Sequence, residues 1–398
     1  MRELGIDIET YSSNDLPSCG VYKYVEAPDF TILLFAYSID GGQVVCCDFA
    51  SGEKLPDEVL AALLDPAVVK TAFNAAFERI CISKYFGWPL MDPAQWRCTM
   101  VRAARMGLPL SLGQCGEVLN LADGKMKEGA ALIRYFSCPT RKKDGTIVRH
   151  LPADAPDRWE TFKAYNVRDV EVEQAVLKVV RRLEPAGFDE ELYTVDQLIN
   201  DRGVMIDRQL VDNAARFDDE YKAQLLEEAK QLTGMENPNS PAQIKEYLRK
   251  VTGSSFASLN KKSLDDIEAQ LKFWPKAKRV LSIRRELGKT SNKKYNAMQQ
   301  CVCADGRIHG LLQFCGAART GRWAGRLVQV QNLPQNHLVD LDYARSLVKA
   351  GYLDDLENNY DNPTQVLSEL IRTAFVAKPG CTFHVCDFSA IEARVIAW

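Results

Sequence analysis

The chain has 398 residues, with 50 Lys and Arg against 53 Asp and Glu, so its formal net charge is −3. This length predicts two or three domains, and the charge excludes a uniformly basic nucleic-acid-binding surface. No apolar run approaches the roughly 20 residues that span a bilayer and the N-terminus lacks a signal-peptide pattern, so we expect a cytoplasmic protein without membrane partners. The 12 cysteines form no pair of CxxC motifs, which favours reduced thiols over a zinc site.

The first 190 residues carry a mixed α/β pattern. Apolar and polar side chains alternate over residues 4–8, and Phe30–Ser38 and Val44–Phe49 are two further apolar runs. Between these runs, Asp40-Gly41-Gly42 is typical of a tight turn. The pattern therefore predicts strands, with the second and third joined as an antiparallel hairpin.

From Leu192 onward the pattern is helical. Apolar residues three and four apart predict helices over residues 210–232, 242–251, 263–271 and 276–300, with Ser240 or Pro241 starting the second. Pro241–Gln300 holds 14 Lys and Arg against 5 Asp and Glu. Such an excess of positive charge is typical of helices that contact the phosphates of a nucleic acid. It is also typical of helices whose charged face is simply exposed to solvent. The candidate DNA contacts in it are Lys289, Lys293 and Lys294. The sequence pattern of residues 382–387 predicts one more strand, and a short helix is expected after it.

Two carboxylates stand close together on the first predicted strand. Asp7 and Glu9 share its polar face, roughly 7 Å apart along the chain. Carboxylates this close resist joint ionisation unless a cation neutralises them. An isolated D-x-E is usually the solvated face of an amphipathic strand, so the pair needs support from other residues.

Further acids follow in the sequence. Glu78 ends the segment Asn74-Ala75-Ala76-Phe77-Glu78, and Asp169 ends the segment Tyr165-Asn166-Val167-Arg168-Asp169. The spacing of four places Tyr165 and Asp169 on one face of a helix. That helix is predicted to begin near Pro156, with Asp157 as cap and Glu160 completing a capping box.

Taken in this order, the three motifs resemble those of the DEDD exonuclease superfamily in its tyrosine-bearing subclass. The resemblance implies a ribonuclease H-like domain that hydrolyses DNA from the 3′ end with two Mg²⁺ or Mn²⁺ ions. It implies that Asp7, Glu9 and Asp169 hold the ions and that Tyr165 orients the attacking water. Glu78 departs from the family, which usually has Asp there. Its extra methylene leaves two roles open: action on an ion through a water instead of direct binding, or a position outside the first coordination shell.

Two stretches between the second and third motifs also stand out. Lys125–Ile133 resembles a segment of bacteriophage proofreading domains. The basic loop Arg141-Lys142-Lys143 follows it. We interpret this loop as an exposed turn, and contact with DNA is the alternative.

A second set of motifs points to polymerisation. Thr320-Gly321-Arg322-Trp323 followed by Gln331-Asn332-Leu333-Pro334 resembles the T-G-R…Q-N-L/I-P stretch of family A (DNA polymerase I-like) DNA polymerases, which lies against the primer-template. The resemblance and the donor chemistry of arginine give six candidate DNA contacts: Arg319, Thr320, Arg322, Arg326, Gln331 and Asn332. Three more segments resemble the family's thumb: Gly203–Asp207, Ser240–Ile244 and Arg284–Tyr295.

The last of these motifs is Val385–Arg394, which resembles polymerase motif A. The resemblance implies that Asp387 holds a metal ion and that Glu392 disfavours a ribose 2′-hydroxyl. Ser389 and Glu392 also stand at capping-box spacing. The family's second palm aspartate and its fingers helix have no counterpart in these residues, so we expect no primer extension from this chain alone. A fragment, a truncated product or one half of a split polymerase with a complementary polypeptide would each explain that.

The sequence thus predicts an exonuclease domain over residues 1–190, a helical thumb over 191–300 and a partial palm over 301–398. The expected partners are single-stranded 3′ ends and primer-template DNA, and a bacteriophage origin would place the protein in the cytoplasm of a bacterial host. Two alternatives stay open. One is a ribonuclease D-like exoribonuclease, against which the polymerase motifs argue. The other is a non-catalytic DNA-binding subunit, against which the retained acids argue.

Overall fold

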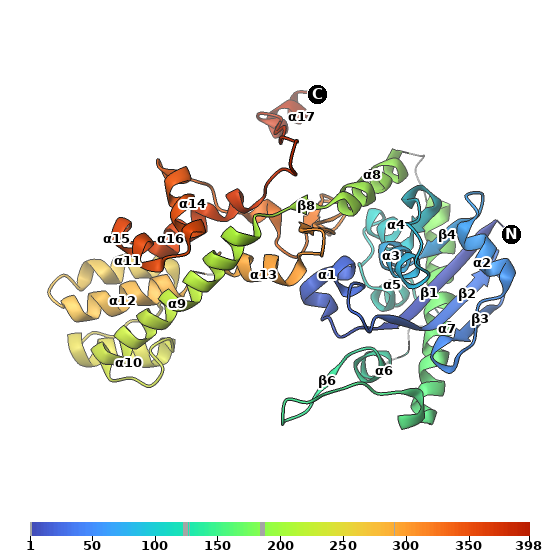
Figure 1. Ribbon diagram of the computed structural model, residues 1–398, viewed down its shortest axis with the longest axis horizontal. Coiled ribbons are helices and arrows are strands. Elements are labelled where there is room, and N and C mark those ends of the chain that lie inside the picture. The colour runs from blue at the N-terminus through green and yellow to red at the C-terminus, as the bar shows by residue number, and fades with distance from the viewer. Residues whose placement is uncertain (1, 122–125, 127, 184–187, 290) are drawn as a thin grey trace. The chain divides into compact units, whose positions relative to one another are not determined.

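The computed structural model describes residues 2–121, 126, 128–183, 188–289 and 291–398 (Figure 1). The chain forms two compact units: unit 1 comprises residues 1–203 and 300–332, and unit 2 comprises 204–299 and 333–398. Residues 300–332 therefore pack with the N-terminal unit, although the predicted domains grouped most of them with the palm. Among the described helices, none combines the length and apolar character that crossing a membrane requires.

Unit 1 is built on a mixed five-stranded sheet with strand order β3-β2-β1-β4-β5 (Figure 1). Its strands are β1 (Glu3–Tyr11), β2 (Thr31–Ile39), β3 (Val44–Asp48), β4 (Val69–Ala72) and β5 (Trp96–Cys98). β2 runs antiparallel to its neighbours β1 and β3, and β4 runs parallel to β1 and β5. The predicted hairpin is confirmed: Asp40 and Gly41 have φ angles of 51° and 72° in the turn between β2 and β3.

Helices surround this sheet. They are α1 (Leu16–Tyr24), α2 (Asp57–Leu64), α3 (Ala75–Tyr85), α4 (Thr99–Arg105), α5 (Leu112–Val118), α6 (Gly129–Phe136), α7 (Pro156–Val180) and α8 (Phe188–Arg202). The long helix α7 packs against β1, β2 and β3. Short strands complete the unit: β6 (Thr140–Arg141), β7 (Ile147–Val148), β9 (Arg307–Ile308), β10 (Leu312–Gln313) and β11 (Ala324–Gly325).

The capping box predicted for α7 is wrong. The helix begins at Pro156, Ala155 occupies the N-cap position, and no side chain caps it. Asp157 is therefore already inside the first turn. Proline at the first helical position has no N–H to satisfy, which removes part of the need for a cap. Glu160 instead forms an ion pair with Lys163 at 2.6 Å.

Unit 2 is mainly helical. Its helices are α9 (Arg208–Thr233), α10 (Pro241–Thr252), α11 (Lys261–Gln270), α12 (Pro275–Leu287), α14 (Leu341–Ala350), α15 (Leu353–Asn359), α16 (Pro363–Leu370) and α17 (Ile391–Ala397), with the strand β8 (Val204–Met205) and α13 (Lys293–Cys301) at its borders. Ser240 caps α10 as predicted, since its side chain accepts from the Gln243 N–H. The helix predicted over 276–300 is two helices, because α12 ends at Gly288.

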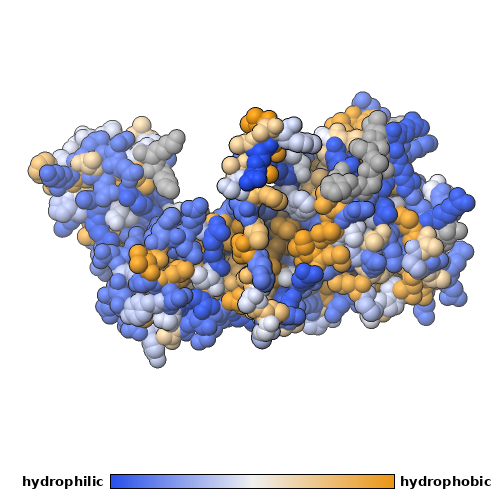
Figure 2. Space-filling view, turned by 90° about the horizontal axis from the view of Figure 1, so that it is seen from above, coloured by the Kyte–Doolittle hydropathy of each residue, from blue (hydrophilic) through white to orange (hydrophobic). Residues whose placement is uncertain are grey.

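The predictions for the last residues are also corrected. Residues 382–387 form no strand, and every side chain from Cys381 to Trp398 is exposed. A strand needs the backbone groups of a neighbour, and none of the described strands pairs with this segment. Ala390, with a φ of 53°, takes the N-cap position of α17. Glu392 is therefore the second helical residue and not the third, which rules out the predicted capping box with Ser389. The exposed side chains of this segment include the large hydrophobic residues Val385, Ile396 and Trp398. Figure 2 shows that hydrophobic residues gather in several places on the face of the molecule seen there.

Candidate functional site

The first candidate site lies where α7 crosses β1. Leu4, Ile6 and Ile8 are buried on one face of β1, so Asp7 and Glu9 lie on the opposite face, as predicted. Glu9 is buried and Asp7 is half-buried. Both acids are therefore held inside the unit and not on a solvated strand face.

Asn166 of α7 holds Asp7 in place. Its Nδ2 donates to Asp7 Oδ2 at 2.7 Å and to the Asp7 backbone oxygen at 3.2 Å. Asn166 is fully buried, and a buried amide must find hydrogen-bond partners. The sequence analysis did not select Asn166, although it stands beside Tyr165 in the third motif. An amide on the buried side of an amphipathic helix was the available signal.

Tyr165 and Asp169 are both buried on α7. Burial, then the nearby charges of Asp169 and Glu9, and a hydrogen bond with Asp169 raise the pKa of the Tyr165 phenol far above its usual value. The phenol therefore stays protonated and can act as a donor. The same interactions bring the first and third motifs together in one cluster.

Glu78 of α3 joins this cluster. It is 5% exposed, and burial, followed by the charges of Asp7 and Glu173, raises its pKa well above the usual carboxyl value. Within the described part of the chain, Glu78 Oε2 has no hydrogen-bond partner. The second motif therefore lies within electrostatic reach of the first.

Glu173 is another acid that the sequence analysis missed. It follows Asp169 by one turn of α7, is buried, and accepts a hydrogen bond from the Thr99 hydroxyl. Burial raises its pKa to about 7, partly offset by the Thr99 hydrogen bond. Its spacing of four from Asp169 was the signal that could have found it.

The donor chemistry of this cluster fits a divalent cation. Asp7, Glu9, Glu78 and Asp169 offer carboxylate oxygens, the ligands that Mg²⁺ and Mn²⁺ prefer. Positive charge would also relieve the cost of burying Glu78 beside Asp7. Over the described residues, no three His, Cys, Asp or Glu side chains stand in a closed metal-binding arrangement.

Gly129, at the start of α6, lies directly against Tyr165. A Cβ atom at Gly129 would stand 2.1 Å from Cε2 of the Tyr165 ring. No real Cβ contact is that short, so only glycine fits. Gly129 belongs to the segment predicted to resemble phage proofreading domains, of which Lys125 and Lys127 lie outside the described residues.

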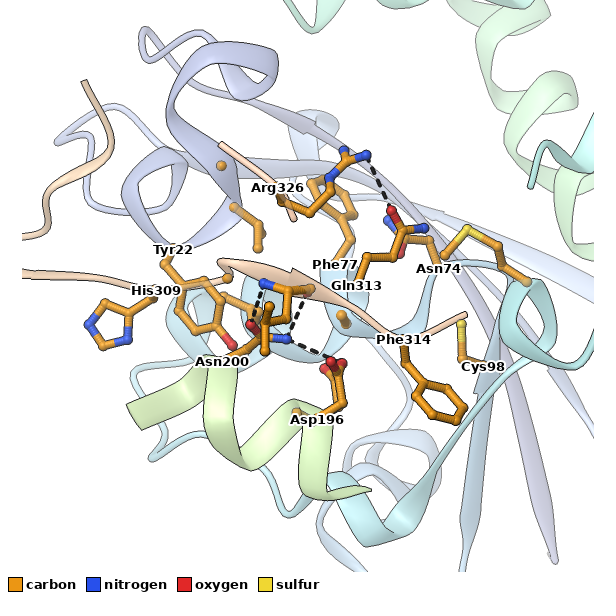
Figure 3. Close-up of a pocket in the computed structure, with 18 of the residues that line it drawn as sticks. Tyr22, Asn74, Phe77, Cys98, Asp196, Asn200, His309, Gln313, Phe314 and Arg326 are labelled. Carbon is orange, nitrogen blue, oxygen red and sulfur yellow. Dashed lines mark hydrogen bonds between the residues drawn. The ribbon is translucent and has the colours of Figure 1, made fainter. Parts of the chain in front are cut away.

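A cavity of about 520 Å³ lies on another side of α3, between α1, α8 and β10 (Figure 3). Asn74 and Phe77 of the second motif line it, together with Asp196 of α8. Asp196 accepts hydrogen bonds from Trp323 Nε1 at 2.8 Å and from Asn200 Nδ2 at 3.2 Å. Burial raises the pKa of Asp196 to about 6, opposed by the Trp323 hydrogen bond.

The polymerase-like loop of residues 317–326 is thereby fixed to α8 within unit 1. Its Trp323 is bound to Asp196, and Arg326 Nη1 donates to Gln313 Oε1 at 3.2 Å (Figure 3). The six predicted DNA contacts of this region are all exposed: Arg319, Thr320, Arg322, Arg326, Gln331 and Asn332. Exposure leaves them accessible to a nucleic acid, as the prediction requires.

The remaining predicted residues lie in unit 2. Lys289 Nζ donates to Gln365 Oε1 at 2.8 Å, Lys293 is exposed and Lys294 is half-buried. Burial lowers the pKa of Lys294. Asp387 and Glu392 are exposed on the C-terminal segment, where Asp387 lies outside regular structure.

Comparison with known proteins identifies the family. Residues 208–398 match the sequence profile of DNA polymerase family A. The whole chain is 52% identical, over 400 residues, to the DNA polymerase of Bacillus phage SP02. Over residues 208–398 the chain belongs to DNA polymerase family A. It covers 61% of the length of that phage relative.

The family A assignment is the one that the polymerase motifs predicted. The fold is also similar to a solved structure, the POL domain of Pol1 from M. smegmatis in complex with DNA primer-template and dNTP. The TM-score is 0.53 at 17% identity, covering 99% of this chain and 59% of that chain. The mixed sheet with surrounding helices confirms the α/β prediction, while the ribonuclease H-like assignment stays a prediction.

Proposed function

We propose that unit 1 is a 3′→5′ DNA exonuclease and that the chain forms part of a proofreading family A DNA polymerase. The observation that carries the exonuclease proposal is the gathering of Asp7, Glu9, Glu78, Asp169 and Tyr165 between β1, α3 and α7. Three segments far apart in the sequence meet there in the order that the resemblance requires.

The proposal assigns a role to each side chain. Asp7, Glu9 and Asp169 would hold two Mg²⁺ or Mn²⁺ ions, with Glu78 as a fourth carboxylate. Bound ions would lower the pKa of the attacking water and stabilise charge on the phosphate. Tyr165, protonated and bonded to Asp169, orients that water. Asn166 keeps the Asp7 carboxylate turned toward the cluster.

Family membership favours DNA over RNA as substrate. Polymerisation on a primer-template is proposed for the whole protein, with Asp387 as metal ligand, Glu392 as the sugar-selecting residue and the exposed residues of the 317–332 region as template contacts. The Pol1 neighbour was solved with such a primer-template and a dNTP, which supports this partner for the chain.

A single-stranded oligonucleotide labelled at its 5′ end tests the exonuclease proposal. With Mg²⁺ or Mn²⁺ it should be shortened stepwise from the 3′ end, and chelation should stop the reaction. Asp7→Asn should abolish shortening, whereas Asp57→Asn, at an exposed aspartate of α2, should leave it intact.

Three results would contradict the proposal. Faster degradation of an RNA oligonucleotide would favour the exoribonuclease alternative. Binding of DNA without hydrolysis under any metal condition would favour a non-catalytic subunit. An unchanged rate in Asp7→Asn would place the reaction elsewhere in the chain.

A further inference from the structure

The basic loop Arg141-Lys142-Lys143 is part of a formed hairpin. β6 and β7 pair antiparallel, with Thr140 opposite Val148 and Arg141 opposite Ile147. The Lys142 N–H donates to the Thr146 oxygen at 2.8 Å. Figure 1 shows this hairpin, labelled β6, extending away from the sheet of unit 1. Residues 140–148 are called the basic hairpin below.

Positive charge is concentrated at the tip of the basic hairpin. Arg141, Lys142 and Lys143 are all exposed. The single acid of the turn, Asp144, accepts a hydrogen bond from the Thr146 N–H at 2.9 Å. Next to these charges, Ile147 is 56% exposed. A projecting element that combines cations with an apolar side chain can contact both the phosphates and the bases of an unpaired strand.

The second strand of the hairpin is anchored beside the carboxylate cluster. Arg149, which follows β7, places its guanidinium 4.2 Å from the centre of the Tyr11 ring. Tyr11 follows Glu9 by two residues on β1 and packs in the same hydrophobic cluster as Tyr165. The chain leaving the hairpin therefore touches a ring that packs in the same hydrophobic cluster as Tyr165.

The first strand is anchored at the same place. β6 follows α6, whose first residue, Gly129, contacts Tyr165. Tyr135 of α6 stacks on His150, with ring centres 3.9 Å apart, and this contact closes the base of the hairpin. Burial, then the charges of Asp15 and Glu9, raise the pKa of the Cys138 thiol between α6 and β6. Cys138 thus lies within electrostatic reach of Glu9.

We propose that the basic hairpin is a single-strand binding arm that receives the nucleic acid strand whose 3′ end enters the carboxylate cluster. This inference rests on the proposed exonuclease function. Both strands of the hairpin are joined at its base to residues that pack with Tyr165: Arg149 contacts Tyr11, and Gly129 of α6 lies against the Tyr165 ring. Because the anchors are Tyr11 and α6, a strand bound by the cations of the hairpin is held next to Glu9 and Tyr165.

The test compares two triple variants of the full chain in an Asp7→Asn background, so that binding is measured without hydrolysis. One variant carries Arg141→Gln, Lys142→Gln and Lys143→Gln. The matched control removes the same charge from exposed residues of unit 1 outside the hairpin, through Lys54→Gln, Lys84→Gln and Arg182→Gln. The probe is a fluorescent 12-nucleotide oligo-dT, followed by anisotropy across a series of NaCl concentrations.

The hairpin variant should bind about tenfold more weakly than its parent. The slope of log affinity against log salt should fall by about 2, because each phosphate contact to a single strand contributes about 0.7. The control should retain most of the affinity. Equal losses in the two variants, or an unchanged salt slope in the hairpin variant, would overturn the proposal. A blunt duplex probe weakened as strongly as oligo-dT would overturn the assignment to single strands.

Hydrolysis in an otherwise wild-type background separates this inference from the proposed function. The hairpin variant should raise KM for oligo-dT while kcat stays within about twofold, since these residues bind the strand and lie outside the cluster. If the parent hydrolyses DNA and the hairpin variant matches it in KM, the hairpin inference alone fails. If the parent never hydrolyses DNA but the hairpin variant still loses affinity, the exonuclease proposal fails and the binding arm stands.

Discussion

The carboxylates of β1 and α7 and the carboxylate of the motif A segment have very different surroundings. Asp169 is 4% exposed and lies on a helix that packs against the sheet. Asp387 lies on a segment without regular structure in which every side chain is exposed. Both were predicted to hold metal ions from sequence motifs alone. A motif supplies the residue type, but burial and neighbouring charge give a carboxylate unusual affinity for a cation.

The largest expected effect on the exonuclease rate comes from comparing two variants, each of which replaces one aspartate with asparagine, one in each region. Asp7→Asn should lower the exonuclease rate on single-stranded DNA by on the order of 100-fold or more, because it removes a proposed ligand. Asp387→Asn should leave that rate unchanged, because its segment takes no part in the unit 1 cluster. Rates of 3′ shortening at saturating Mg²⁺ measure both. Equal losses in the two variants would contradict the separation of the sites.

A smaller effect is expected from Gly129→Ala. The added methyl group would stand 2.1 Å from the Tyr165 ring, so the ring must move, and kcat should fall by about 10- to 100-fold. Gly116→Ala in α5 is the matched control, since its Cβ would meet Val172 at an ordinary 3.7 Å. Single-turnover rates and thermal melting of both variants check this. Wild-type kcat in Gly129→Ala would show that the position of Tyr165 does not matter.

Stability should change with pH through Asp196. Its pKa is about 6 in the folded chain and about 4 when unfolded. The stability contributed by the protonated carboxyl is therefore fully present below pH 4 and is lost as the pH rises through 6, by about 3 kcal/mol in all. Asp196→Asn removes this titration. Urea unfolding of both proteins at pH 4.5 and 7 should give a smaller pH dependence for the variant, and parallel profiles would refute the assignment.

The smallest effect is expected in the basic helices of unit 2. Lys293→Glu should weaken duplex DNA binding a few-fold and flatten its salt dependence, because this side chain is exposed and can contact a phosphate. Lys294→Glu, at a half-buried position, should act mainly on folding stability instead. Binding titrations at several salt concentrations, with melting curves alongside, distinguish the two. If the affinity for duplex DNA does not change with salt concentration, these helices do not contact phosphates and their charged face is only solvated.

Local pattern was sufficient for several features of this chain. The alternation of polar and apolar residues predicted that Asp7 and Glu9 lie on the face of β1 opposite Ile6. The turn sequence at Asp40 predicted the first hairpin. Ser240 caps a helix at the position where the sequence predicted that a helix begins. Each of these depends on residues within a few positions of one another. The polymerase motifs likewise identified the family, because they are runs of specific residues.

Contacts between distant segments decided the rest. Asn166 reaches Asp7 across 159 positions, and Trp323 reaches Asp196 across 127, so neither bond has a local signature. The need for glycine at position 129 follows from the Tyr165 ring, which a separate helix brings to it. The sequence by itself determined which side chains are candidates for the chemistry. The tertiary structure alone decided which of them meet, because burial and charge act between segments that folding brings together.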